Sequence, residues 1–263
     1  EVESEGALCT LLGHVDRLRA PFFLLGIGSN VLLPDDGLAG VVAKLSGEFE
    51  RFEFDGSAVR AGGAVPLSKL ARTASRRGLL GLESLAGFPS TVGGAVRMNA
   101  GSYGCEISDV LTSVRVVDRH GHVASMPVED LGAGYRSTRL QKSGQIVVEA
   151  CFRLRPGDAE AASAHIADLN RKRWQSLPSG SPNAGSIFKN PMDDHAGRLI
   201  ESVGLKGRRI GRAHVSERHA NFIVNDGGAA ATDVQDLMAE AQRMVWERSG
   251  VWLEPEIRLV GRW

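Results

Sequence analysis

Residues 87–104 read GFPSTVGGAVRMNAGSYG, and the organisation of the chain turns on this stretch. Its glycines follow no fixed short period, which excludes collagen and a plain linker. Because Val92, Val96 and Met98 are interleaved with small residues, part of the stretch must be buried, and its buried N–H groups then need partners. A bound anion would supply them, since glycine allows close approach. Tight packing of two elements at the glycines is the alternative, and both interpretations stay open.

The composition is that of an ordinary globular protein with a core of its own. The chain has 263 residues, 43% of them hydrophobic and 24% charged. Its 31 basic and 31 acidic residues balance, so nucleic acid and anionic membranes are not expected as partners. No apolar run approaches the ~20 residues of a membrane span, and we expect no signal peptide. Three widely spaced cysteines argue against a disulfide framework or a zinc site and fit a reducing compartment, and we predict no metal site.

Hydrophobic periodicity predicts an α+β protein. Helices are expected at residues 7–19, 66–77, 158–174, 196–203 and 233–248, the last of them capped by Thr232. Strands are expected at residues 22–25, 31–33, 39–45, 49–54, 57–61, 110–118, 121–126, 145–154, 220–224 and 252–260. The alternating strands in the middle of the chain indicate a mostly antiparallel lobe, and a second lobe is expected after a linker at 176–183.

A first glycine pair, Gly26 and Gly28, lies between two expected strands. A dinucleotide fingerprint of the Rossmann type needs a third glycine and a helix directly after it. Val31 occupies the third position and the following stretch is β, so we exclude that fold. A phosphate-binding turn through Ser29 and Asn30 and an ordinary turn between strands both remain open.

Two further segments carry residue types that suit catalysis. Ser186 lies in AGSIFKNP (184–191), where it is either a proton donor on a rigid strand or a turn cap. Glu256 lies at the start of the last expected strand, where an inward carboxyl could act as a general acid. Residues 100–104 nearly match a nucleophile elbow, but Ala100 replaces the first glycine and no strand leads in, so we do not predict a hydrolase.

Seven motifs occur in one order: LGIGSN (25–30), the stretch 87–104, GYRS (134–137), AGSIFKNP (184–191), GLKG (204–207), HANFIVN (219–225) and WLEPEIR (252–258). With them the chain closely resembles the UDP-N-acetylenolpyruvoylglucosamine reductase (MurB) family of bacterial peptidoglycan synthesis, from about Leu24 to Gly261. It resembles the compact subtype, because the interval from Leu154 to Arg171 leaves no room for a Tyr-bearing insertion.

The resemblance implies an α+β fold of the vanillyl-alcohol-oxidase type, with two FAD-binding subdomains and a smaller α+β substrate-binding lobe. The first subdomain would comprise residues 1–46 with the C-terminal strand 252–263, the second 47–174, and the lobe 175–251. The resemblance also implies a non-covalent FAD, NADPH as co-substrate, and reduction of UDP-N-acetylglucosamine enolpyruvate to UDP-N-acetylmuramate. The expected setting is the bacterial cytoplasm, with the protein a monomer or a weak dimer.

The same resemblance assigns roles to residues. Arg136 and Glu256 would polarise the substrate carboxylate, and Ser186 would deliver a proton. This set suits a reaction that builds up negative charge in a dry site, which needs a fixed cation and a proton donor. Tyr135, Arg136 and Asn190 would contact the substrate. The residues that would line the FAD are Gly26, Ile27, Gly28, Ser29, Asn30, Ser90, Thr91, Gly93, Gly94, Asn99, Ala100, Gly101, Arg171 and Arg258.

The chain departs from the family pattern in two places, and two other functions remain open. The family normally begins with a segment holding an Asn-Thr and a Gly-Gly pair, which this sequence does not contain before its first helix, so either an upstream segment is missing or this chain lacks it. The lysine that grips the pyrophosphate in the larger subtype has no clear match near Ser176. The alternatives are a flavin oxidase of the same fold for another sugar or alcohol, and a non-catalytic nucleotide-binding protein.

Overall fold

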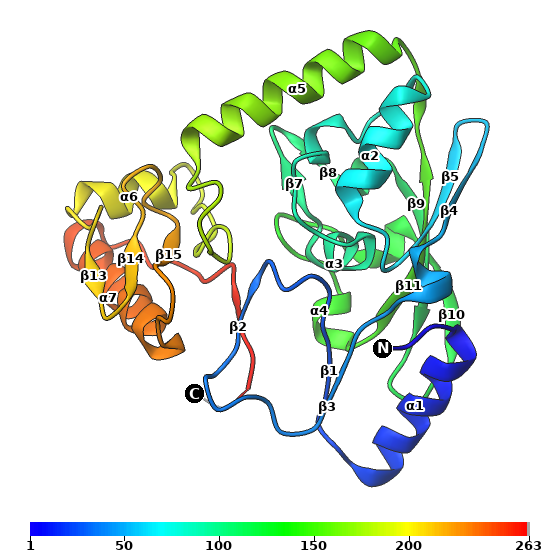
Figure 1. The fold of residues 1–263 in the computed structure, drawn as a ribbon, viewed down its shortest axis with the longest axis horizontal. Helices are drawn as coiled ribbons and strands as arrows, with labels where there is room; N and C mark the ends of the chain where they lie inside the picture. The colour runs from blue at the N-terminus through cyan, green and yellow to red at the C-terminus, as the bar shows by residue number, and fades with distance from the viewer. Residues whose placement is uncertain (262–263) are drawn as a thin grey trace. The chain divides into compact units, whose positions relative to one another are not determined.

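The structure is a computed structural model that describes residues 1–261, and the chain folds into two compact units (Figure 1). The first unit comprises residues 1–27 and 40–170, and the second comprises residues 28–39 and the chain from Arg171 onward. The assignment of two FAD-binding subdomains and a substrate lobe stays a prediction, and residues 262 and 263 of its last strand lie outside the described residues. Within residues 1–261, no helix has the length and apolar character that a membrane crossing requires.

The first unit is built on a five-stranded antiparallel sheet in the order β10-β9-β11-β5-β4. Its strands are β4 (Phe52–Asp55), β5 (Ala58–Gly62), β9 (Leu111–Val117), β10 (Val123–Pro127) and β11 (Ile146–Arg153). Successive side chains of a strand point to opposite faces. Val147 therefore packs in the core with helices α2 (Leu67–Arg76) and α3 (Val92–Met98), whereas Ile146 and Val148 pack with α1 (Glu5–Leu18). The predicted antiparallel α+β lobe is confirmed.

Helix α1 forms where an apolar stripe and a cap coincide. Leu8, Leu12 and Val15 are its buried residues, and the Ser4 hydroxyl accepts the N–H of Ala7 at its start. The helix ends at Arg19, whose backbone is left-handed with φ +50°. The parallel pair β1 (Phe22–Leu24) and β3 (Val41–Ala43) follows it.

The glycine stretch contains a helix that the sequence analysis did not predict. The hydroxyl of Thr91 caps α3 by accepting the N–H of Gly94, and Asn99 ends the helix with a left-handed backbone. At its start α3 lies close to the sheet: a Cβ on Gly93 would lie 3.0 Å from the carbonyl oxygen of Gly63 and 3.1 Å from that of Val147. The stretch therefore brings a helix against a sheet, which is the packing that small residues allow.

The remaining elements of the first unit are short. They are η1 (Gly47–Glu50), β6 (Leu79–Leu80), η2 (Glu83–Leu85), β7 (Gly101–Ser102), β8 (Cys105–Glu106), η3 (Ile107–Asp109), η4 (Val128–Leu131), α4 (Leu140–Ser143) and β12 (Arg155–Pro156). Because η1 occupies residues 47–50, the strand expected from residue 49 begins only at Phe52. Helix α5 (Ala159–Ser176) follows, and the boundary between the two units falls within it.

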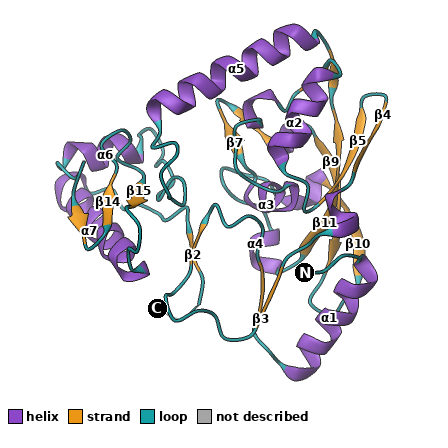
Figure 2. Cartoon of the chain, viewed as in Figure 1, coloured by secondary structure: helices purple, strands orange, loops and turns teal. Residues whose placement is uncertain are grey.

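The second unit packs helices α6 (Ala196–Ser202) and α7 (Ala231–Ser249) with the antiparallel sheet β13-β14-β15. The strands are β13 (Arg209–Ile210), β14 (Ala213–Val215) and β15 (Ile223–Asn225) (Figure 2). A separate parallel pair joins β2 (Val31–Leu32) to β16 (Arg258–Leu259).

Three details of the second unit differ from expectation. The strand expected at 220–224 begins at Ile223. The one expected at 252–260 is reduced to β16, preceded by an isolated antiparallel bridge between Pro255 and Phe188. Thr232 is not the cap of α7. The helix begins one residue earlier, and the carboxylate of Asp233 accepts the N–H of Ala230 instead.

The contact between α3 and the sheet can be tested with Gly93→Ala. The added methyl must displace two backbone oxygens, so we expect the free energy of unfolding to fall by about 1–3 kcal/mol, measured by urea titration. The matched control is Gly13→Ala in α1, where nothing lies within 4 Å of the new Cβ and a gain of about 0.5–1 kcal/mol is expected. Equal effects of the two substitutions would contradict this account.

Candidate active site

Arg136 lies at the tip of a tight turn in the first unit. Gly134 and Ser137 close the turn with two backbone hydrogen bonds, each of 3.0 Å. Arg136 has φ +51°, a left-handed conformation that costs a non-glycine residue about 1–2 kcal/mol. Such a backbone persists only where its surroundings hold it, and it is common at functional sites.

The guanidinium of Arg136 lies against its own turn and the glycine stretch. Nη2 donates to the carbonyl oxygen of Gly101 at 2.8 Å, and the guanidinium carbon lies 4.9 Å from the centre of the Tyr135 ring. A Cβ on Gly101 would approach Nη1 to 3.0 Å. Glycine at 101 therefore leaves room for the arginine, and the structure brings Arg136, Tyr135 and Gly101 together.

Asn99 anchors the Arg136 turn to the end of α3. Its Nδ2 donates to the Gly134 carbonyl at 3.0 Å and to Oε2 of Glu106 at 2.7 Å, and its Oδ1 accepts the N–H of Ser108 at 3.3 Å. The residue is 1% exposed. All three hydrogen bonds are made within the protein, and the prediction that Asn99 lines the FAD stays a prediction. Ala100 is equally buried.

The start of α3 needs no anion for its backbone N–H groups. Those of Val92 and Gly93 donate to the carbonyl oxygens of Val65 and Gly63, and that of Gly94 donates to the Thr91 hydroxyl. The hypothesis that a bound anion satisfies these groups is wrong for these three residues. Close packing of helix against sheet, the alternative, explains Gly93.

The turn at residues 26–28 offers the donors that the α3 start does not. Among residues 1–261, the N–H groups of Gly26, Ile27 and Gly28 have no hydrogen-bond partner, and all three residues are exposed. Gly28 has φ +78°, and a Cβ on Gly26 would lie 3.2 Å from the Thr91 hydroxyl. Successive N–H groups on a glycine turn suit a phosphate, so the residues present fit a dinucleotide cofactor.

Ser186 and Glu256 are carried by neighbouring segments of the second unit. The N–H of Glu256 donates to the carbonyl of Ile187, the residue after Ser186, at 2.7 Å. Asn30 is bonded to the Glu256 segment at two points. Its Nδ2 donates to the Glu256 carbonyl at 3.2 Å, and its backbone carbonyl accepts the N–H of Arg258 at 3.1 Å. A Cβ on Gly185 would lie 3.7 Å from the carbonyl oxygen of Ser29. The structure thus gathers most of the residues predicted for this unit.

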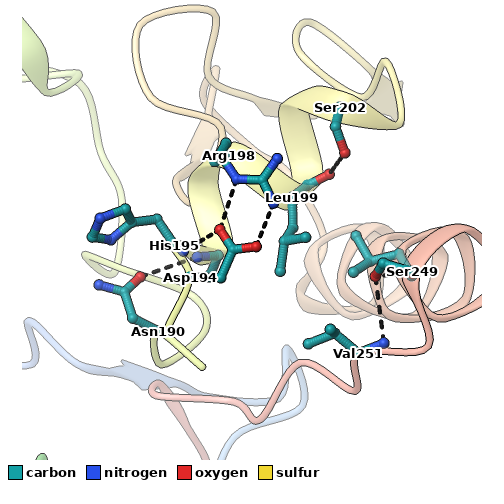
Figure 3. Close-up of polar contacts among 10 residues, drawn as sticks. Asn190, Asp194, His195, Arg198, Leu199, Ser202, Ser249 and Val251 are labelled. Atoms are coloured by element: carbon teal, nitrogen blue, oxygen red, sulfur yellow. Dashed lines mark hydrogen bonds and ion pairs between the residues drawn. The ribbon is translucent and has the colours of Figure 1, made fainter. Parts of the chain in front are cut away.

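Asn190 lies at the start of α6 (Figure 3). Its Oδ1 accepts the N–H of Ala196 at 3.1 Å, and Oδ1 of Asp194 accepts the N–H of His195 at 2.6 Å. Asp194 also pairs with Arg198, whose hydrogen bonds hold the pKa of the Asp194 carboxyl at about 2. Arg171 lies on α5 and belongs to the second unit.

The predicted residues divide between the units. Tyr135, Arg136 and the glycine stretch belong to the first unit, whereas Ser186, Asn190 and Glu256 belong to the second. Sequence reasoning missed Asn221, a buried residue that pairs with Phe188. The available signal was an amide side chain inside the apolar run 220–224, where a buried polar group must find partners.

Two family models match the chain. Residues 1–126 match a model described as FAD binding domain, and residues 177–260 match the C-terminal domain of UDP-N-acetylenolpyruvoylglucosamine reductase. The fold and the first of these family models therefore define an FAD-binding protein of the α+β class.

Known relatives narrow this class. The chain is 46% identical to UDP-N-acetylenolpyruvoylglucosamine reductase 2 of Symbiobacterium thermophilum, over 99% of this chain and 85% of the relative. It is 44% identical to the reductase of Alkalilimnicola ehrlichii, over 97% of this chain and 86% of the relative. The crystal structure of the reductase (MurB) from Thermus caldophilus matches with a TM-score of 0.84 and 38% identity, covering 98% of this chain and 90% of that one. The chain belongs to the UDP-N-acetylenolpyruvoylglucosamine reductase family, as its motifs predicted.

The ion pair at the start of α6 predicts a pH dependence of stability. Because the folded-state pKa of Asp194 is lowered to about 2, its contribution is present above the ordinary carboxyl range and is lost as pH falls toward 2. Asp194→Asn keeps an oxygen that can accept the N–H of His195 but removes the charge. The variant should therefore be less stable than wild type at pH 6, and the difference should shrink as pH falls to 2 and below. Urea titrations across this range measure the difference, and Arg198→Gln should reproduce it. A difference that stays constant with pH would contradict the assignment.

Proposed function

We propose that this protein reduces the enolpyruvyl ether of UDP-N-acetylglucosamine to UDP-N-acetylmuramate with NADPH, a step of peptidoglycan synthesis. FAD is its cofactor and NADPH its reductant. The observation that carries the proposal is membership of this reductase family along nearly the whole chain. The placement of Arg136 in a held turn, and of Ser186 beside the Glu256 segment, supports it.

The segment that would hold the cofactor phosphates is the turn at residues 26–28, with its unpartnered N–H groups among residues 1–261. Ser90 and Thr91 of the first unit and Ser29 and Asn30 of the second are also proposed to bind the FAD. When bound, FAD supplies through N5 the hydride that the vinyl CH₂ carbon of the substrate accepts. The protein must then manage the charge and the proton at the neighbouring carbon.

Arg136 is proposed to bind the substrate carboxylate. As hydride reaches the vinyl carbon, negative charge grows on the adjacent carbon and spreads into that carboxylate. A planar guanidinium can meet both carboxylate oxygens, and a group fixed beforehand costs no reorganisation when the charge appears. The bond from Nη2 to Gly101 and the left-handed backbone support this preorganisation.

Ser186 is proposed to donate the proton to the carbon that carries the charge. A serine hydroxyl is a poor acid in water, but it can serve where the acceptor is strongly basic and within hydrogen-bond reach. Glu256 is proposed to polarise the carboxylate in its protonated or hydrogen-bonded form. Tyr135 and Asn190 are proposed to contact the substrate.

The setting is also part of the proposal. The three cysteines form no disulfide among the described residues, which suits a reducing bacterial cytoplasm. We propose a monomer or a weak dimer acting on the two small substrates.

Two measurements decide between this function and its alternatives. Purified protein should be yellow, and acid precipitation should release all the colour into the supernatant, because the FAD is proposed to be non-covalent. NADPH should be consumed steadily when the enolpyruvyl sugar is present. A flavin oxidase of the same fold would ignore that sugar, and a non-catalytic nucleotide-binding protein would stay colourless after FAD is added.

Arg136→Lys should be far from conservative, because an ammonium group cannot meet two carboxylate oxygens at once. Flavin reduction by NADPH should survive, whereas reoxidation by the sugar should slow more than tenfold, equivalent to ~1.4 kcal/mol or more. Stopped-flow absorbance of the flavin measures each half-reaction. Arg139→Lys, an exposed neighbour bonded to the Asp130 carbonyl, is the control and should change neither. Equal losses in both half-reactions would assign Arg136 to the fold instead.

Ser186→Ala should leave FAD binding and the NADPH half-reaction nearly intact. Reoxidation by the sugar should fall by ~10² or more, the usual contribution of a positioned proton donor. Ser186→Cys should recover part of the rate, because a thiol is the stronger acid. Ser181→Ala in the preceding loop serves as the control. Reoxidation of Ser186→Ala at the wild-type rate would make Ser186 a turn residue and leave Glu256 or water as the proton source.

A further inference from the structure

Asn221 pairs its side chain with the backbone of Phe188. Its Oδ1 accepts the Phe188 N–H at 2.9 Å, and its Nδ2 donates to the Phe188 carbonyl at 2.7 Å. The backbone carbonyl of Asn221 accepts the N–H of Ile187 at 2.9 Å. Asn221 is 3% exposed and Phe188 1%, so these bonds are made away from water.

The other side of the same segment is paired with residues 254–256. The carbonyl of Ile187 accepts the Glu256 N–H at 2.7 Å, and the N–H of Lys189 donates to the Glu254 carbonyl at 2.9 Å. Phe188 lies opposite Pro255 in this short antiparallel bridge. In an antiparallel pair, alternate residues direct both backbone groups toward the partner strand. Those of Phe188 therefore point the opposite way, toward Asn221.

On the side of Phe188 that faces away from residues 254–256, the side chain of Asn221 makes the two hydrogen bonds that a neighbouring strand would make. An asparagine side chain carries one carbonyl acceptor and an NH₂ donor, the same pair that a backbone peptide would offer Phe188. An alanine at 221 would leave a buried donor and a buried acceptor unpaired, each at about 1–3 kcal/mol. Either the segment would distort to recover those bonds, or it would admit water.

Asn221 is itself held in place. Its backbone N–H donates to Nδ1 of His219 at 3.2 Å, and the His219 carbonyl accepts the N–H of Phe222 at 3.0 Å. Burial lowers the pKa of His219. This agrees with a neutral ring whose Nδ1 accepts the hydrogen bond from the Asn221 N–H. The anchor for Phe188 is thus a fixed turn.

We propose that Asn221 is a positioning residue for the proton transfer. By pairing both backbone groups of Phe188, it fixes the segment that begins with Ser186 and bonds to Glu256. It acts through this backbone and touches no reacting atom. The inference rests on the proposed function, because it assigns Asn221 to the placement of the Ser186 hydroxyl. A misplacement of about 1 Å at a reacting group can cost 10²-fold in rate, so a frame of this kind has a measurable effect.

Asn221→Ala tests the proposal against Asn225→Ala as the matched control. Asn225 also satisfies two backbone groups of this unit, accepting the N–H groups of Gly227 and Ala229 at 2.8 and 3.1 Å, but it lies at the other end of β15. In stopped-flow experiments on the holoenzyme, Asn221→Ala should slow reoxidation by the enolpyruvyl sugar at least tenfold. Reduction by NADPH should stay within twofold, as should both half-reactions of Asn225→Ala.

A double variant separates positioning from general damage. In the Ser186→Ala background, Asn221→Ala should cost less than twofold more, because its effect passes through the missing hydroxyl. If the rate losses of the two single variants multiply in the double variant, the proposal is overturned. Reoxidation of Asn221→Ala at the wild-type rate, or equal slowing of both of its half-reactions, would also overturn it. Should Asn221→Ala not fold, Asn221→Ser, which is too short to reach both groups of Phe188, replaces it with the same expectations.

Hydrogen exchange keeps this inference separate from the proposed function. The peptide containing residues 186–190 should lose protection in Asn221→Ala and keep it in Asn225→Ala. Unchanged protection would overturn the role of Asn221 whatever the substrate is. Failure of the wild-type flavin to be reoxidised by the enolpyruvyl sugar would instead overturn the proposed function.

Discussion

The close approach of α3 to the five-stranded sheet is the constraint on which the first unit depends. A Cβ on Gly63 would lie 2.2 Å from the Val147 carbonyl oxygen, so no side chain fits at that position, and the N–H of Gly93 bonds to the Gly63 carbonyl at 2.8 Å. This contact fixes the axis of a helix only seven residues long. Because the helix is short and held at its start, its other end is fixed as well, and Asn99 can anchor the Arg136 turn there.

In each unit, a buried asparagine side chain holds the backbone of an irregular segment by hydrogen bonds. Each unit must hold a short irregular segment that carries a predicted site residue, and neither segment lies in a regular sheet. Asn99 bonds the Gly134 carbonyl in one unit, and Asn221 bonds both backbone groups of Phe188 in the other. An amide side chain suits this task because it can donate and accept without carrying a charge into the interior.

Sequence reasoning was strongest where local signals agreed. Helices α1, α2 and α5 and the β9–β10 hairpin follow from apolar periodicity and turn residues, within a few residues of their predicted ends. Helix α3 was missed because glycines obscure the spacing of Val92, Ala95 and Val96, although Thr91 offered a cap. The strand expected at 252–260 could not be bounded, since its length depends on a partner at the far end of the chain.

The candidate site followed the same division. Motifs identified the segments around Arg136, Ser186 and Glu256. They could not show which side chains use their hydrogen bonds to hold the fold. Asn99 is predicted to line the FAD, but its side-chain bonds to Gly134 and Glu106 appear only in three dimensions. Family membership is confirmed by the relatives, whereas the roles of individual residues stay predictions.

The pairing of β2 with β16 also bears on how the protein is made. In this parallel pair Val31 lies opposite Arg258. The two strands of the pair are therefore separated by more than 200 residues of sequence, yet both belong to the second unit. During translation, residues 28–39 therefore leave the ribosome long before β16, the partner of β2, has been synthesised. Closing so long a loop is slow and entropically costly, whereas the sheet of the first unit is complete in sequence by Arg153. The first unit can thus form while synthesis continues, and the second waits for the last strand, which leaves β2 as an unpaired edge during translation.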